Sequence, residues 1–128
     1  MCLIYAGIKE TTKEDMVCYK VYVSFEGKLV SPYMRSPMPN MNEVTKTRLG
    51  KPYGIGSCVD EGFHSFATLK DAIRVSKFLT RQGHNSIIVR CIIPKDSECY
   101  VGFFQVGTSY CSDSIKLIEL VKTCIQNQ

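Results

Sequence analysis

The side chain best suited to chemistry near neutral pH is His64, one of two histidines in the chain. It follows Phe63 and stands two residues before Phe66, at the predicted end of a short strand. An imidazole can hydrogen-bond a ribose, stack on a base, or act as a general acid or base. The alternative is a packed residue with one satisfied ring nitrogen. We treat His64 as a candidate ligand-binding residue.

Positive charge gathers in residues 32–57, a long segment rich in proline and glycine. Its basic residues are Arg35, Lys46, Arg48 and Lys51, and its only acid before Ser57 is Glu43. Tyr33 and Tyr53 offer rings that can stack on a base. Because charge-assisted hydrogen bonds hold phosphates well, we predict that these side chains contact a phosphorylated ligand while His64 reads its ribose or base edge.

Two further patterns in this region allow other chemistry. Gly54-Ile55-Gly56-Ser57 could cradle an anion with backbone amides, although it lacks the spacing of a dinucleotide or phosphate-loop motif. Cys58 is the one candidate for thiol catalysis, because Glu61 and His64 follow it closely. A flexible turn is the alternative for the glycines.

The elements that must position these residues can be read from periodicity. Residues 1–8 suggest a first strand, and alternation over 18–25 predicts a strand with one face on the core, followed by a hairpin arm at 28–31. Residues 64–66 end a short strand, and a helix over about 68–82 follows, with Thr68 as cap, an apolar stripe and Gly83 as stop. Residues 86–94 read as a buried central strand. Residues 100–106 and 115–121 are further strand candidates, and 114–124 could finish as a short helix.

Composition favours one domain over residues 1–128, with 45% apolar residues to build a core. The fold class that follows is α+β: a small, curved, mostly antiparallel sheet or split barrel with one main helix. A net charge of +4 favours anionic partners. It falls short of the dense basic patches of nucleic-acid-binding proteins, so we do not expect nucleic acid as a partner.

The seven cysteines lack zinc-ligand spacing, so we expect no metal and no cofactor. Their odd number and the absence of a signal peptide or membrane span favour the cytoplasm.

Gly62-Phe63-His64, then Thr68, Asp71-Ala72 and an apolar strand at 87–93, resembles the middle of ADP-ribosyltransferase-like domains. With the late run Ser112 to Glu119, the order of elements is also similar to small uncharacterised phage and gut-bacterial proteins carrying a Gly-Phe-His motif. The resemblance implies an ADP-ribosyltransferase-like fold. In that family an early His or Arg, a middle Tyr or Ser and a late Glu act on NAD.

Here His64 takes the middle position, Glu119 is the late acid, and the early strand offers no His or Arg. The resemblance therefore favours a nucleotide-binding protein, such as a phage counter-defence protein that sequesters a nucleotide signal. Because a chain of this size has little surface to enclose a ligand alone, we also expect a homo-oligomer that completes the pocket. The alternatives are an enzyme acting on NAD through His64 and Glu119, and an interaction module that inhibits a host factor. His84-Asn85-Ser86-Ile87 also matches one half of a two-histidine phosphodiesterase, whose second half is missing.

Overall fold

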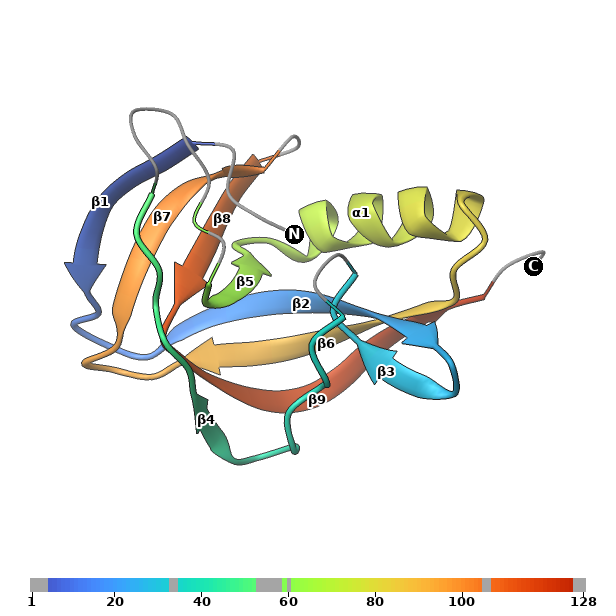
Figure 1. Cartoon of the computed structure of the whole chain (residues 1–128), viewed down its shortest axis with the longest axis horizontal. Helices are drawn as coiled ribbons and strands as arrows, with labels where there is room; N and C mark the ends of the chain where they lie inside the picture. Colours follow the sequence, from blue (N-terminus) through green and yellow to red (C-terminus); the bar gives the residue numbers. More distant parts are fainter. Residues whose placement is uncertain (1–4, 33–34, 53–58, 60, 105–106, 126–128) are drawn as a thin grey trace.

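The computed structural model describes residues 5–32, 35–52, 59, 61–104 and 107–125. Within these residues the chain has an α+β fold: one helix covers a mostly antiparallel sheet that does not close into a barrel (Figure 1). The strands are β1 (Tyr5–Thr11), β2 (Met16–Phe25), β3 (Lys28–Val30), β4 (Val44–Lys46), β5 (Phe63–Phe66), β6 (Ser86–Ile93), β7 (Glu98–Phe104), β8 (Gly107–Ser112) and β9 (Ser114–Cys124), and the helix is α1 (Leu69–Arg81). The sheet order is β1-β7-β8-β5-β2-β6-β9-β4, and β3 pairs with β2.

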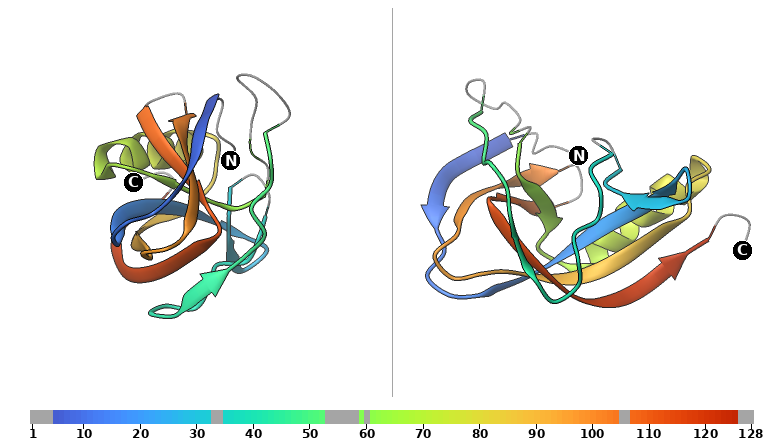
Figure 2. Two further views of the ribbon diagram at one scale, coloured as in Figure 1. Left: turned by 90° about the vertical axis from the view of Figure 1, so that its left-hand side faces the viewer. Right: turned by 60° about the horizontal axis from the view of Figure 1, so that its bottom comes forward.

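The sheet bends sharply where β5 meets β2. These two strands share a single registered pair, Tyr19 with Phe66, whereas β2 and β6 pair over eight residues each. With so little pairing at the junction, β1, β7 and β8 turn away from the long strands β2, β6 and β9 (Figure 2). The predicted curved sheet is therefore confirmed, and it remains open.

Helix α1 begins where the sequence predicts it. The Thr68 hydroxyl accepts a hydrogen bond from the backbone N–H of Asp71 at 3.2 Å, which satisfies one of the unpaired donors of the first turn. Ala72, Val75 and Leu79 are buried against Val21, Val23 and Ile88 of the sheet. The apolar stripe of the helix could include either Leu79 or Phe78 by spacing, and the structure buries Leu79 and leaves Phe78 exposed.

Strand β2 is buried on both faces, although its alternation predicted only one core face. Val21 and Val23 pack beneath α1, and Cys18 and Tyr22 pack on the opposite face. The reason is the curvature, because the sheet and its connections fold back over the side that faces away from the helix and bring Cys99, Ile115 and Leu117 against it. Lys20, which shares a face with Cys18 and Tyr22, is enclosed as a result.

The segment 32–57 is more regular than its prolines predicted. It contains β4, where Val44-Thr45-Lys46 pairs with β9, and it is tied to the sheet through backbone hydrogen bonds from Met38, Asn42, Thr47 and Gly50. Strand β9 also remains extended to Cys124, so the short helix considered there is not formed. β-branched residues at Val44 and Thr45 favour the strand that proline content alone argued against.

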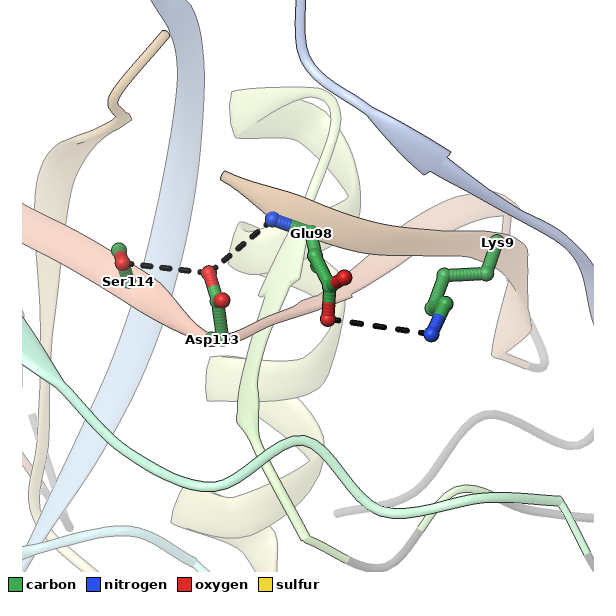
Figure 3. Close-up of polar contacts among 4 residues, drawn as sticks. All are labelled: Lys9, Glu98, Asp113 and Ser114. Atoms are coloured by element: carbon green, nitrogen blue, oxygen red, sulfur yellow. Dashed lines mark hydrogen bonds and ion pairs between the residues drawn. The ribbon is translucent and has the colours of Figure 1, made fainter. Parts of the chain in front are cut away.

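Asp113 fixes the point where the chain passes from β8 to β9. Its carboxylate accepts hydrogen bonds from the Glu98 backbone N–H at 3.1 Å and from the Ser114 hydroxyl at 3.1 Å, as Figure 3 shows. Its backbone carbonyl accepts from the Thr47 N–H at 2.8 Å. Asp113 therefore links β7 and β9 to the segment 32–57, which crosses the sheet.

Candidate functional site

A cavity of about 240 Å³ lies between the sheet and the segment that crosses it. Strands β2 and β5 form one wall, and residues of the crossing segment form the other. Its described lining residues are Lys20, Val21, Tyr22, Ser31, Pro32, Ser36, Pro37, Pro39, Thr47, Glu61, Gly62, Phe63, His64 and Phe66. The cavity therefore lies between the His64 strand and described residues of the segment 32–57.

The cationic side chain at the wall of this cavity is Lys20. Its residue is only 6% exposed, and its Nζ donates a hydrogen bond to the His64 backbone carbonyl at 2.6 Å. The same nitrogen lies 5.3 Å from the centre of the Tyr22 ring and 5.9 Å from that of Phe63. Among the described residues, no carboxylate lies within ion-pair distance of it. Lys20 is thus held by one carbonyl and two aromatic rings, with no opposite charge.

Burial lowers the pKa of the Lys20 ammonium, because the charged form loses its hydration. Neighbouring thiols of Cys91, Cys18 and Cys111 act in the opposite direction but more weakly. An anion entering the cavity would restore the charged form of Lys20, since opposite charges at short range favour ionisation. Protonation of this amine is therefore sensitive to any negative charge placed in the cavity.

The Tyr22 hydroxyl is the second notable group at the cavity. It is fully buried and has no hydrogen-bond partner in the part of the chain that the structure describes. Burial also raises the pKa of Tyr22, so the hydroxyl keeps its proton at neutral pH. A buried donor without a partner costs free energy, and a ligand oxygen would satisfy it.

His64 lies at the cavity, but its ring is engaged with the protein. Its Nε2 is 2.7 Å from the Val59 carbonyl, and because a carbonyl only accepts, this nitrogen carries the proton. Burial, with a smaller contribution from the charge on Lys20, lowers the pKa of His64 to about 3. At neutral pH the ring is therefore uncharged, and its Nε2 proton is committed to Val59 rather than to a ligand.

The four predicted phosphate contacts of the segment 32–57 are exposed and are not among the described lining residues. The Arg35 guanidinium lies over the Phe25 ring, 4.2 Å from its centre. Arg48 pairs with Glu61 at 3.7 Å, and both side chains are largely exposed. Lys46, in β4, and Lys51 are surface residues. These charges can attract an anion from solution, while the positive charge inside the cavity belongs to Lys20.

Several predicted residues lie outside the described part of the chain. They are Tyr33, Tyr53, the Gly54–Ser57 turn and Cys58. Their predicted roles in stacking, anion binding and thiol chemistry stay predictions.

The two residues named for the enzymatic alternative do not share a site. His64 is in β5 and Glu119 in β9, and the strands β2 and β6 lie between them in the sheet. Three strand spacings correspond to roughly 14 Å. The Glu119 carboxylate instead pairs with Arg90 at 2.7 Å. His84, the half-buried residue of the phosphodiesterase pattern, follows α1 and is not among the described lining residues.

Sequence reasoning missed Lys20 and Tyr22. Their one available signal is the composition of the second face of β2, where Cys18 and Tyr22 flank Lys20 at the spacing of a strand. A lysine with a cysteine on one side and a tyrosine on the other is unusual for a strand face exposed to solvent, because cysteine is among the most buried residue types.

Among the described residues, no group of three or more His, Cys, Asp or Glu side chains is placed to hold a metal ion. In the same part of the chain, no helix has the length and apolar character needed to cross a bilayer. Neither finding selects a function for the cavity.

Comparisons of the chain with protein-family models, with curated proteins and with solved structures found no match. The function is therefore argued from the geometry of the cavity alone.

Proposed function

We propose that this protein binds a small anionic ligand, of the phosphorylated nucleotide type, in the cavity beside Lys20. The observation that carries the proposal is a buried lysine at a cavity wall with no carboxylate partner among the described residues. Buried charges are normally paired, because an isolated one loses its hydration without compensation. A phosphate group would supply the missing negative charge.

The remaining lining groups suit a phosphate and its sugar. Ser31, Ser36 and Thr47 line the cavity, and each has a hydroxyl that can donate to a phosphate oxygen. Phe63 offers an aromatic ring at the same wall. A volume of about 240 Å³ lies below the roughly 300 Å³ at which pockets for drug-sized ligands begin, so we expect a mononucleotide or a smaller phosphorylated compound to enter.

The test is calorimetric titration of the full chain with AMP and with inorganic phosphate, in a phosphate-free buffer. We expect saturable binding near one ligand per chain, and a loss of at least about tenfold in affinity in Lys20→Met, because one charge-assisted hydrogen bond is removed. The matched control is Lys28→Met, which removes an exposed strand lysine and should leave affinity within about twofold. Equal affinities of both variants and the parent would refute the role of Lys20.

The enzymatic alternative receives less support. A cavity of this size does not enclose a dinucleotide, and the separation of His64 from Glu119 leaves the pair without a common reacting atom. The ADP-ribosyltransferase-like fold assignment and the activity on NAD stay predictions. Release of nicotinamide from NAD by the purified chain would establish that activity.

Sequestration of a nucleotide signal, as in phage counter-defence, extends the same proposal to a cytoplasmic setting. Cys18, Cys91, Cys99 and Cys124 form no disulfide among the described residues, which supports a reducing compartment. Mass spectrometry of small molecules released on denaturation would identify such a signal. The homo-oligomer and the interaction with a host factor stay predictions that light scattering and pull-down experiments would check.

A further inference from the structure

Lys20 is chemically distinct from the surface lysines. It is the one lysine in the buried class among the described residues, it lines the cavity, and its Nζ lies 5.3 Å from the centre of the Tyr22 ring and 5.9 Å from that of Phe63. A lysine amine becomes a nucleophile when desolvation favours its uncharged form, because only the uncharged form carries a lone pair. Burial lowers the pKa of Lys20 and so favours this uncharged form.

The groups around Lys20 leave the amine free to react. Within the described residues its one hydrogen bond goes to the His64 carbonyl, and an amine can keep that bond while its lone pair points elsewhere. The ionisable groups that act on it are the thiols of Cys18, Cys91 and Cys111 and the ring of His64. The nearby Glu61 carboxylate also lines the cavity but is paired with Arg48.

We propose that the Lys20 amine forms an imine with small carbonyl compounds, aldehydes and 2-oxo acids, that enter the cavity. The Nζ lone pair attacks the carbonyl carbon, a C–N bond forms, and the carbonyl oxygen takes up a proton. The resulting carbinolamine then loses that oxygen as water, with the second hydrogen coming from the amine, and the C=N bond forms. One amine and one carbonyl compound give one imine and one water, with no oxidant or reductant.

Tyr22 supplies the proton that this step needs. Tyr22 is one of the lining residues, and its buried hydroxyl has no hydrogen-bond partner among the described residues. A protonated phenol can donate to the departing oxygen, which otherwise leaves as hydroxide, and then recover its proton from the nitrogen of the new C=N bond, so that it ends the step unchanged. Lys20 and Tyr22 lie two residues apart on β2, so the strand itself presents them on one face.

The inference rests on the same cavity as the proposed function, because both require that small molecules enter it. It does not require that the cavity prefers anions. Anion binding and imine formation can therefore fail separately.

The experiment uses the native full chain at pH 7.5 with sodium cyanoborohydride, which reduces imines to stable amines. Propanal and glyoxylate serve as the neutral and the anionic probe, and the modified lysines are mapped by peptide mass spectrometry over time. We expect Lys20 to be labelled at least about tenfold faster than the exposed Lys28 and Lys70, because a larger fraction of its amine is uncharged. Labelling of Lys20 at or below the rate of these surface lysines, with both probes, overturns the proposal.

Two further measurements separate the parts of the inference. Tyr22→Phe should slow labelling of Lys20 about tenfold and leave Lys28 unchanged; an unchanged Lys20 rate overturns the role of Tyr22. AMP should protect Lys20 if nucleotides occupy the cavity. Fast labelling of Lys20 without protection by AMP or phosphate supports imine formation and counts against the proposed anion site. Tight AMP binding with an unreactive Lys20 supports the anion site and counts against imine formation.

Discussion

Replacing His64 by Gln is expected to remove the part of the pH dependence of the free energy of unfolding that comes from His64. In the folded chain the pKa of His64 is lowered to about 3, mainly by burial, while an unfolded histidine titrates near 6.5. As pH falls below about 6.5, the unfolded state therefore binds a proton that the folded state does not. The folded state is favoured fully above this pH and loses stability as pH falls toward 3.

The magnitude follows from linkage. Between pH 7.5 and pH 5, the difference between the two pKa values corresponds to a loss of about 2 kcal/mol in the free energy of unfolding. The His64→Gln side chain can still donate an amide N–H toward the Val59 carbonyl, which the imidazole now contacts at 2.7 Å, but it does not titrate. The variant should therefore lose about 2 kcal/mol less than the parent over this pH range.

Urea unfolding followed by circular dichroism at both pH values measures this difference. His84→Gln is the matched control, because it removes the only other histidine, outside the cavity lining that the structure describes, and should keep the parent's pH dependence. Identical pH dependence in the parent and in His64→Gln would refute the reasoning. An NMR titration that places the pKa of His64 near 6.5 would do so as well.

Two further substitutions test the packing around the cavity and the strand junction. Tyr22→Phe removes a buried hydroxyl without a described partner, so urea unfolding should find it neutral or up to about 1 kcal/mol more stable, while calorimetry finds weaker binding of AMP; a clear loss of stability would mean that the hydroxyl is satisfied. Asp113→Ala should cost about 1–3 kcal/mol, because it leaves the Glu98 backbone N–H and the Ser114 hydroxyl without their acceptor. Lys9→Ala, which breaks only an exposed contact of 3.8 Å with Glu98, should cost less than about 1 kcal/mol, and equal losses in both would contradict this account.

Local patterns determined much of the fold. The helix could be predicted within a residue or two, because the Thr68 cap, the apolar stripe and Gly83 act within a few residues of one another. The alternation of β2 and the apolar run of β6 identified two of the three long strands for the same reason. Strand β8 was not predicted, since residues 107–112, which apart from Tyr110 are small, carry no strong period.

The sequence also indicated the two sides of the site but not its chemistry. It joined His64 to the segment 32–57, and the cavity lies between them. The sequence analysis assigned the positive charge of the site to arginines and lysines that are exposed. A cluster of basic residues is easier to identify in a sequence than a single lysine, Lys20, within a strand. Only the tertiary structure decided that Lys20 and Tyr22 line the cavity and that the His64 ring contacts the Val59 carbonyl. The reason is that contacts between residues far apart in the sequence bend the sheet back on itself, and this bend determines what each face of β2 packs against.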